Sequence, residues 1–161
     1  MTSRRTFLLG SVTLAGIGAV AALLGPTAFA DTKYEVTHTD AEWLKILGPN
    51  AFAIMRREGT EPAGSSPLDA EERKGTYVCA GCDLPLYASA TKFHSGTGWP
   101  SFWQPLPNAV IEKRDTSAGM VRTETHCRRC GGHLGHVFND GPRPTGLRYC
   151  MDGLALKFIP A

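Results

Sequence analysis

Apolar residues follow three distinct patterns along this 161-residue chain. From Phe7 to Leu24 they form one continuous run, which is diluted by glycines. Over residues 38–58 the pattern is helical. From Thr76 onward, short runs rich in Val, Ile, Thr, Tyr and Phe alternate with clusters of Gly, Pro and Asn, which is the spacing of antiparallel β structure.

The helical region is predicted to contain two short helices. Thr39 or Asp40 can cap the first, AEWLKIL, and Gly48-Pro49 ends it. The second, NAFAIMRRE, ends at Gly59. Both are too small to bury a core alone, so we expect a helical hairpin that packs on the rest of the chain. The segment that follows, TEPAGSSPLDAEERKG, is predicted to be a loop or a wrapping arm.

The predicted strands are short runs: TYVC, AVIEKR, MVRTETHC, LRYCM and LALKFI. A chain of 161 residues has room for one domain plus a leader. We therefore expect one domain over residues 31–161, mainly β, in which antiparallel sheets carry the N-terminal helical hairpin.

The first thirty residues have the pattern of an export signal. Arg4 and Arg5 precede the apolar run, the run ends in the motif AFA, and no acidic residue occurs before Asp31. The Arg pair followed by TFLL resembles a twin-arginine signal. The prediction is a signal peptide over residues 1–30 and export to the periplasm by that route. A retained membrane anchor is the alternative, because the apolar run approaches the length of a membrane span.

Charge argues against one class of function. The chain has 17 Lys and Arg against 15 Asp and Glu, and removing a leader that carries two arginines leaves 15 of each. A net charge near zero argues against general electrostatic binding of nucleic acid, which needs a strong basic excess.

Four of the five cysteines form two C-x-x-C pairs. Cys79 and Cys82 are separated by 44 residues from Cys127 and Cys130. Four thiolates with no open position make a structural zinc site, so we expect one structural Zn²⁺ ion. Two disulfides are the alternative in an exported protein, although a C-x-x-C disulfide closes a very small loop and is more often redox-active than structural.

The fifth cysteine, Cys150, lies in the predicted strand LRYCM. Side chains alternate along a strand, so Arg148, Cys150 and Asp152 should project from the same face. A guanidinium two residues away on that face favours the thiolate form of the cysteine. A buried, inert thiol is nevertheless the commoner fate of a single free cysteine.

Four segments together carry a family resemblance: CAGCDLPLY, KFHSGTGWPSFW, THCRRCGGHLGHVFNDGP and PTGLRYCMDGLALKF. In this order they resemble methionine sulfoxide reductase B, which reduces the R epimer of methionine sulfoxide. The match runs from about Lys33 to Phe158. It implies the zinc-stapled, β-tent-like fold of that family. It also implies an enzyme that repairs oxidised exported proteins and prefers peptide substrates to free methionine.

The resemblance also implies roles for individual residues. The Cys150 thiolate attacks the sulfoxide sulfur while an acid protonates the departing oxygen, which yields methionine and a cysteine sulfenic acid. The acid and polarising roles fall to His133, His136 and Asp140, and Trp99 packs against the methyl group of the substrate. The alternatives are metal ligation by the two histidines, capping of the NDGP turn by Asp140, and core packing of Trp99.

Two positions depart from the family pattern. Thr97 stands where many members carry a resolving cysteine, so the Cys150 sulfenic acid must be reduced directly by a thioredoxin-like protein or another external thiol. Asp152 stands where the family usually has Asn, and its carboxylate would raise the pKa of the thiol unless it pairs with Arg148 or points away. The pattern suggests no role for His126.

Two other classes of function remain open. One is a zinc-stabilised β module that binds a partner without chemistry, and the other is a dithiol oxidoreductase that uses a C-x-x-C pair as its redox centre. For the leading interpretation, the expected partners are oxidised proteins or peptides and a thiol reductant. The mature chain is expected to be a monomer that is not embedded in a membrane.

Overall fold

The structure is a computed structural model that describes residues 34–161. The predicted signal peptide over residues 1–30 lies outside the described residues. Over residues 34–161, none of the helices has the length and hydropathy needed to cross a membrane.

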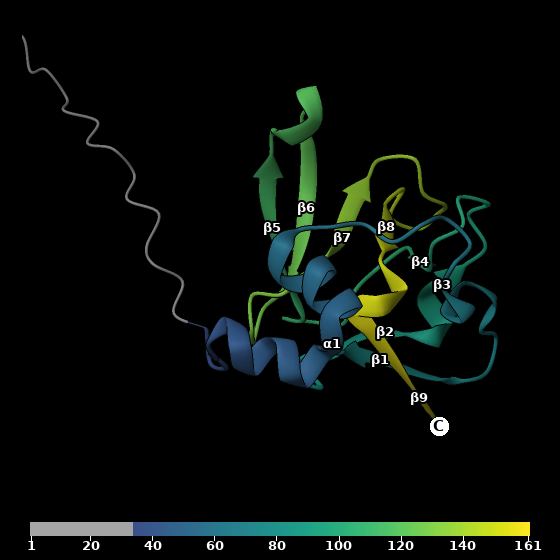
Figure 1. Cartoon of the computed structure of the whole chain (residues 1–161). Coiled ribbons are helices and arrows are strands. Elements are labelled where there is room, and N and C mark those ends of the chain that lie inside the picture. Colours follow the sequence, from purple (N-terminus) through teal and green to yellow (C-terminus); the bar gives the residue numbers. More distant parts are fainter. Residues whose placement is uncertain (1–33) are drawn as a thin grey trace, which may run out of the picture. The chain divides into compact units, whose positions relative to one another are not determined.

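Two antiparallel sheets form the framework of the fold, as Figure 1 shows. The smaller sheet has the order β2-β1-β9 and consists of β1 (Gly75–Cys79), β2 (Pro85–Ala88) and β9 (Leu156–Pro160). The larger sheet has the order β3-β4-β8-β7-β6-β5. Its strands are β3 (Lys92–Phe93), β4 (Ser101–Phe102), β5 (Val110–Asp115), β6 (Arg122–Cys127), β7 (His133–Phe138) and β8 (Arg148–Met151). The prediction of a mainly β fold with antiparallel sheets is confirmed.

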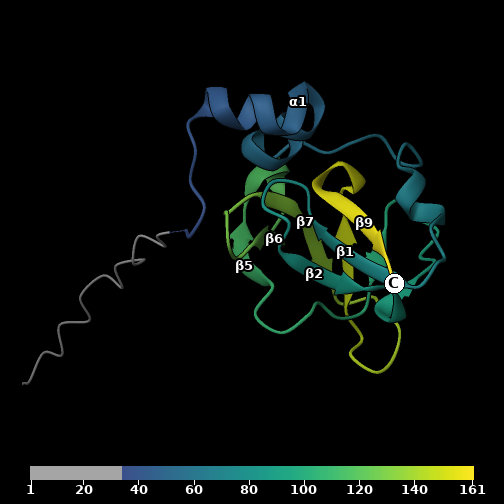
Figure 2. The ribbon, with the colours of Figure 1, turned by 90° about the horizontal axis from the view of Figure 1, so that it is seen from below.

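The helical region forms one kinked helix, α1 (Asp40–Arg57). Thr39 and Glu42 form a capping box at its start, in which each side chain accepts a hydrogen bond from the backbone N–H of the other. Gly48 has φ 72° and interrupts the helical geometry just before Pro49. The predicted break is therefore present, because the backbone is not helical at Gly48, where the two helical segments meet. α1 lies outside the sheets and contacts β7 (Figure 2).

Residues 34–161 also contain four short 3-10 helices. η1 (Pro67–Ala70) lies between α1 and β1, and the others lie between strands: η2 (Ser89–Thr91), η3 (Ser117–Gly119) and η4 (Gly153–Ala155). The last of these joins β8 of the larger sheet directly to β9 of the smaller one.

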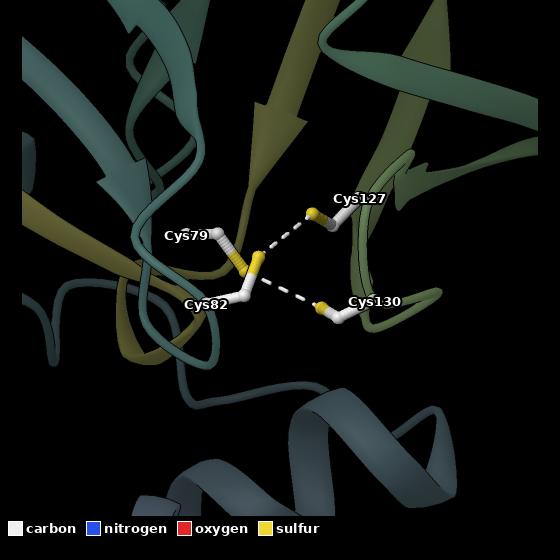
Figure 3. Close-up of side chains that lie close together, drawn as sticks. All are labelled: Cys79, Cys82, Cys127 and Cys130. Atoms are coloured by element: carbon white, nitrogen blue, oxygen red, sulfur yellow. Dashed lines mark hydrogen bonds between the residues drawn. The ribbon is translucent and has the colours of Figure 1, made fainter. Parts of the chain in front are cut away.

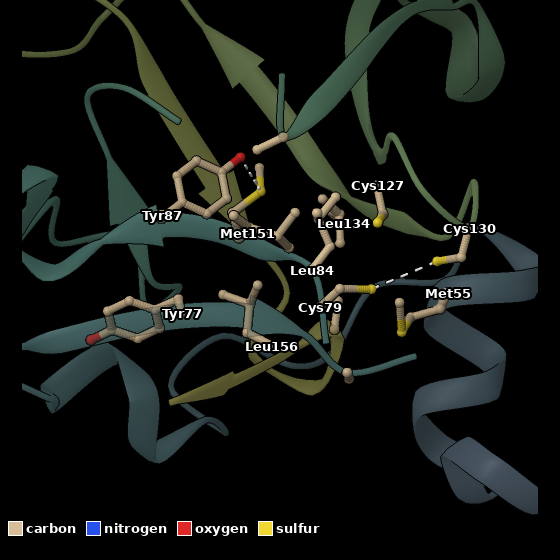
Figure 4. Packing of buried hydrophobic residues seen from close by; sticks show 14 of the residues in the cluster. Met55, Tyr77, Cys79, Leu84, Tyr87, Cys127, Cys130, Leu134, Met151 and Leu156 are labelled. Atoms are coloured by element: carbon tan, nitrogen blue, oxygen red, sulfur yellow. Dashed lines mark hydrogen bonds between the residues drawn. The ribbon is translucent and has the colours of Figure 1, made fainter. Parts of the chain in front are cut away.

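Aromatic side chains hold the two sheets together. Tyr87 of the smaller sheet stacks on Phe102 of the larger one with ring centroids 4.4 Å apart, and Tyr77 meets the same ring edge-on at 4.9 Å. All three side chains are fully buried. The hydroxyl of Tyr87 also donates to the sulfur of Met151 on β8 over 3.1 Å (Figure 4). The strand that carries Cys150 is therefore anchored to the core through the residue that follows it.

Register places Cys150 in the middle of the larger sheet. β8 pairs with β4 on one side and β7 on the other, so Cys150 lies opposite Ser101 and opposite His136. Gly135 has φ 143°, and a Cβ there would lie 2.2 Å from the carbonyl oxygen of Cys150. Only glycine permits this close approach of β7 to β8.

Candidate functional site

The four predicted metal ligands come together at one end of the sheets. Cys79 ends β1 and Cys127 ends β6, and Cys82 and Cys130 lie in the turns that follow (Figure 3). Sγ of Cys79 is 3.7 Å from Sγ of Cys130, and Sγ of Cys82 is 3.5 Å from Sγ of Cys127. All four sulfurs lie within 4.8 Å of one another.

This sulfur cluster fits a tetrahedral metal ion. Four sulfurs at about 2.3 Å from one zinc ion would lie roughly 3.8 Å apart. Both of these contacts join one C-x-x-C motif to the other, which favours a shared metal over two disulfides within the motifs. Because β1 and β6 belong to different sheets, a metal held here connects the smaller sheet to the larger one.

A pocket of about 150 Å³ opens beside Cys150. It is lined by residues that lie far apart in the sequence: Thr60, Trp99, Arg122, Gly135, His136, Phe138, Cys150 and Asp152. The structure thus brings together three of the predicted site residues, namely Cys150, His136 and Trp99. Asp152, which the family resemblance did not assign to the site, also lines this pocket.

Hydroxyl groups surround the thiol of Cys150. Oγ1 of Thr97 lies 3.8 Å from Sγ, within reach of a hydrogen bond to sulfur. Oγ of Ser95 is 2.8 Å from Oγ1 of Thr97 and 2.8 Å from Oγ of Ser101. Burial raises the pKa of the Cys150 thiol, and Thr97, Arg148 and Ser101 lower it only in part. The predicted electrostatic help from the guanidinium is present but does not offset burial.

Arg148 and Asp140 lie next to the pocket, not in its lining. Nε and Nη2 of Arg148 donate to the two carboxylate oxygens of Asp140 over 2.9 and 2.8 Å, and the guanidinium lies 4.5 Å from the ring centroid of Phe138. The Asp140 side chain is 61% exposed. Asp140 therefore affects the site indirectly, because it orients the guanidinium of Arg148.

The two predicted histidines have different surroundings. Nε2 of His136 lies 2.9 Å from Oδ2 of Asp115, and burial lowers the pKa of His136. His133 is buried behind the pocket, with Nδ1 2.5 Å from Oε1 of Glu124 and Nε2 3.6 Å from Oδ2 of Asp152. Burial alone would lower the pKa of His133, but the two carboxylates outweigh it and raise that pKa.

Comparison with known proteins agrees with this geometry. A family model described as SelR domain matches residues 47–160. The chain is 56% identical over 126 residues to Peptide methionine sulfoxide reductase MsrB of Leptospira interrogans serogroup Icterohaemorrhagiae serovar Lai (strain 56601). The aligned region covers 78% of this chain and 96% of that protein. The chain is 52% identical over 130 residues to the protein of the same name from Agrobacterium fabrum (strain C58 / ATCC 33970), with 80% and 96% covered.

The chain belongs to the methionine sulfoxide reductase B family. The family resemblance of the four motifs is confirmed, and so is the expected class, an oxidoreductase. The match to the family model begins within α1, so it includes the second part of this helix as well as both sheets.

Glu61, which the sequence pattern did not reveal, makes hydrogen bonds to two residues that line the pocket. Its backbone N–H donates to Oδ1 of Asp152 over 2.9 Å, and its carbonyl accepts from Nε1 of Trp99 over 3.1 Å. Its carboxylate accepts from the N–H groups of Gly153 and Leu154 over 2.6 and 3.0 Å. Glu61, a buried residue of the predicted loop, therefore connects Asp152 with Trp99, and both of these residues line the pocket.

The carboxylate of Asp152 adopts neither arrangement expected for it. It does not pair with Arg148, because that guanidinium binds Asp140 instead. It does not point away either, since it is buried, lines the pocket and contacts Glu61 and His133.

Glu124 is a second residue that the sequence analysis overlooked. Its carboxylate lies between His133 and His126, with Oε2 2.8 Å from Nε2 of His126. Alternation along the predicted strand MVRTETHC could have indicated it, because Glu124 and His126 share one face. His126, which had no assigned role, holds the carboxylate that contacts His133.

Proposed function

We propose that this protein reduces the R epimer of methionine sulfoxide in polypeptides, with Cys150 as the nucleophile. The observation that carries the proposal is the position of this thiol. It opens into a pocket walled by Trp99, Phe138 and His136, while the other four cysteines form the metal cluster. Aromatic faces suit the methyl thioether part of the substrate. The relatives named peptide methionine sulfoxide reductase support the same assignment.

The reaction transfers one oxygen atom between two sulfurs. The Cys150 thiolate attacks the sulfoxide sulfur and forms an S–S bond, while the sulfoxide oxygen takes up one proton. The hydroxyl group then moves to the Cys150 sulfur, as its bond to the methionine sulfur and the S–S bond both break. The products are a thioether and the sulfenic acid of Cys150. The methionine sulfur is reduced by two electrons, and the cysteine sulfur is oxidised by two.

His133 is suited to hold the proton that the oxygen receives. Its pKa is raised, so the imidazolium persists to higher pH than that of an ordinary histidine. Its Nε2 is buried and has no hydrogen-bond partner in the described part of the chain, and it points towards Asp152 at 3.6 Å. Asp152, whose carboxylate lies near Nε2 of His133, also lines the pocket. His136 lines the pocket directly and is oriented by Asp115.

Regeneration of Cys150 requires an external thiol, for which we propose a thioredoxin-like protein. The group beside the catalytic sulfur is the hydroxyl of Thr97, not a second thiol. One external thiol would displace water from the sulfenic acid to form a mixed disulfide, and a second thiol would then release Cys150. Cys150 is half-buried and therefore reachable.

The metal is proposed to be zinc, held by Cys79, Cys82, Cys127 and Cys130. Four thiolates are a donor set that zinc prefers in closed, structural sites. Bound there, the ion would link the two sheets and take no part in the reaction. We further propose export through the N-terminal twin-arginine pattern, with oxidised exported proteins as substrates for a monomeric enzyme.

The test is a stereospecific assay of the purified chain and a Cys150→Ser variant, with dithiothreitol as the reductant. The unsubstituted chain should reduce the R sulfoxide of N-acetylmethionine and leave the S sulfoxide intact. The variant should lose turnover and retain its metal. Turnover by the variant would refute the assignment of the nucleophile. Absence of turnover in the unsubstituted chain would favour a binding module, and reduction of disulfides without bound metal would favour a dithiol oxidoreductase.

A further inference from the structure

A second and larger hollow adjoins the catalytic pocket. It has a volume of about 830 Å³ and lies between the second half of α1, the segment 60–68 and the η4–β9 segment. We call it the α1 groove, and its apolar walls include Ile46, Ile54, Pro62, Leu68, Leu154 and Phe158. Thr60 lines both the groove and the catalytic pocket, so the two hollows are neighbours that share this residue.

The α1 groove leaves large apolar side chains in contact with solvent. Ile46 is 49% exposed and Leu154 is 40% exposed. These are two of the six large hydrophobic residues that are exposed in the described part of the chain. Exposed apolar residues that gather in a hollow mark a binding surface more often than residues scattered singly over a convex surface.

The charged residues of the groove are already engaged within the protein. Its described lining contains Glu61 and Lys157. The Glu61 carboxylate accepts from two backbone N–H groups of η4, and Nζ of Lys157 donates to Asp83 over 2.9 Å. A charged side chain entering the groove would lose water without gaining an ion pair, whereas an apolar side chain would be stabilised.

We propose that the α1 groove binds apolar side chains that flank the oxidised methionine in a polypeptide substrate. The inference rests on the proposed function. The catalytic pocket of about 150 Å³ has room for a single side chain, so the rest of the substrate lies on the surface around it. A substrate chain that leaves the pocket over Thr60 enters the groove, where Leu154 and Ile46 contact the neighbouring side chains.

Hydrogen bonds fix the groove relative to the catalytic pocket. Glu61 binds Asp152 of the pocket through its backbone and Leu154 of the groove through its carboxylate. Glu61 is therefore hydrogen-bonded to one residue of each hollow. A preformed arrangement of this kind lowers the entropic cost of ordering a bound chain.

The experiment compares peptides that have Leu or Asp on both sides of methionine (R)-sulfoxide with the minimal substrate N-acetylmethionine (R)-sulfoxide methylamide. For the unsubstituted chain, kcat/KM should be about tenfold higher for the Leu peptide than for the Asp peptide, because burial of one large apolar side chain suffices for a factor of this order. In Leu154→Asn and Ile46→Asn this ratio should fall to about threefold or less. Both variants should turn over the minimal substrate at the unsubstituted rate.

Ile159→Asn is the matched control. Ile159 is 51% exposed but lines neither hollow, so its substitution should leave the tenfold ratio unchanged. Equal kcat/KM for the two peptides in the unsubstituted chain, or an unchanged ratio in both groove variants, would overturn the inference. Failure to reduce the minimal substrate would instead overturn the proposed function. Calorimetric titration of the Leu and Asp peptides would then decide peptide binding by the groove independently.

Discussion

The backbone N–H of Glu61 donates a 2.9 Å hydrogen bond to Oδ1 of Asp152, a residue 91 positions later in the chain. The contact is buried on both sides. It leaves the other carboxylate oxygen of Asp152 directed at Nε2 of His133, 3.6 Å away. A buried carboxylate thus lies at the pocket, and it raises the pKa of both Cys150 and His133.

Asp152→Asn should leave activity intact or raise it. The amide oxygen can keep the hydrogen bond from Glu61, so the geometry survives. The carboxylate of Asp152 raises the pKa of both Cys150 and His133, so its removal lowers both. Thiolate then forms at lower pH and the imidazolium is lost at lower pH, and both limbs of the pH profile of kcat/KM should move to lower pH.

Profiles of the variant and the unsubstituted chain, measured from pH 5 to 10 on one peptide sulfoxide, provide the test. Asp69→Asn is a suitable control, because this half-exposed aspartate lies outside the lining of the catalytic pocket. A large loss of kcat/KM at every pH would show that the carboxylate itself is required.

Glu61→Gln should destabilise the protein and weaken substrate binding. The buried carboxylate accepts two N–H groups of η4, and an amide can accept at only one of its two positions. One buried donor is left unsatisfied, which costs about 1–3 kcal/mol in the free energy of unfolding. The matched substitution Glu58→Gln, at an exposed residue, should cost much less. Urea unfolding of both variants measures the difference, and equal costs would contradict the role of Glu61.

Local patterns were sufficient to predict much of the fold. The C-x-x-C pairs predicted the sulfur cluster, because each motif supplies two thiolates and a tetrahedral metal needs four. Runs rich in Val, Ile, Thr and Tyr predicted β1, β5, β6, β8 and β9. The break at Gly48-Pro49 was predicted from the two residues that cause it.

The strand β7 was not among the predicted runs. Its sequence HLGHVF contains Gly135 and two histidines, which weaken the strand signal. Gly135 is there because β7 approaches the backbone of Cys150 more closely than a Cβ would allow. The local preference therefore fails at the point where the strand forms the pocket.

The contacts that organise the pocket could not be predicted from local patterns. Glu61 contacts Asp152 and Trp99 through its backbone N–H and C=O, which every residue but proline carries. The pairing of Arg148 with Asp140 instead of Asp152 likewise depends on how the loop after β7 folds back. Such choices are made by tertiary structure and leave no signature in the sequence.

Cys82→Ser should release the metal and loosen the join between the two sheets. Structural zinc contributes on the order of 10 kcal/mol in small zinc-binding peptides, so its loss should lower the unfolding midpoint by at least roughly 10 °C. Metal content by elemental analysis and the midpoint by circular dichroism check both effects. Cys150→Ser is the control, since it removes a cysteine outside the cluster and should change neither quantity. Full retention of bound metal in Cys82→Ser would contradict the four-ligand assignment.

Thr97→Ala should raise the pKa of the Cys150 thiol, whereas Thr97→Ser should leave it nearly unchanged. The Thr97 hydroxyl lies 3.8 Å from the sulfur and favours the thiolate. A hydrogen bond to a charged group contributes about 1.5–3 kcal/mol, so its loss disfavours the thiolate and raises this pKa.

The rate of alkylation of Cys150 by iodoacetamide, measured against pH, reports this pKa. For Thr97→Ala the curve should shift to higher pH, and kcat/KM near neutral pH should fall about tenfold because less thiolate is present. The serine variant keeps the hydroxyl and should follow the unsubstituted curve. If both variants shifted equally, the effect would come from the lost methyl group and not from the hydroxyl. Coincident curves for all three proteins would show that Ser101 and Arg148 are sufficient to set the pKa of Cys150.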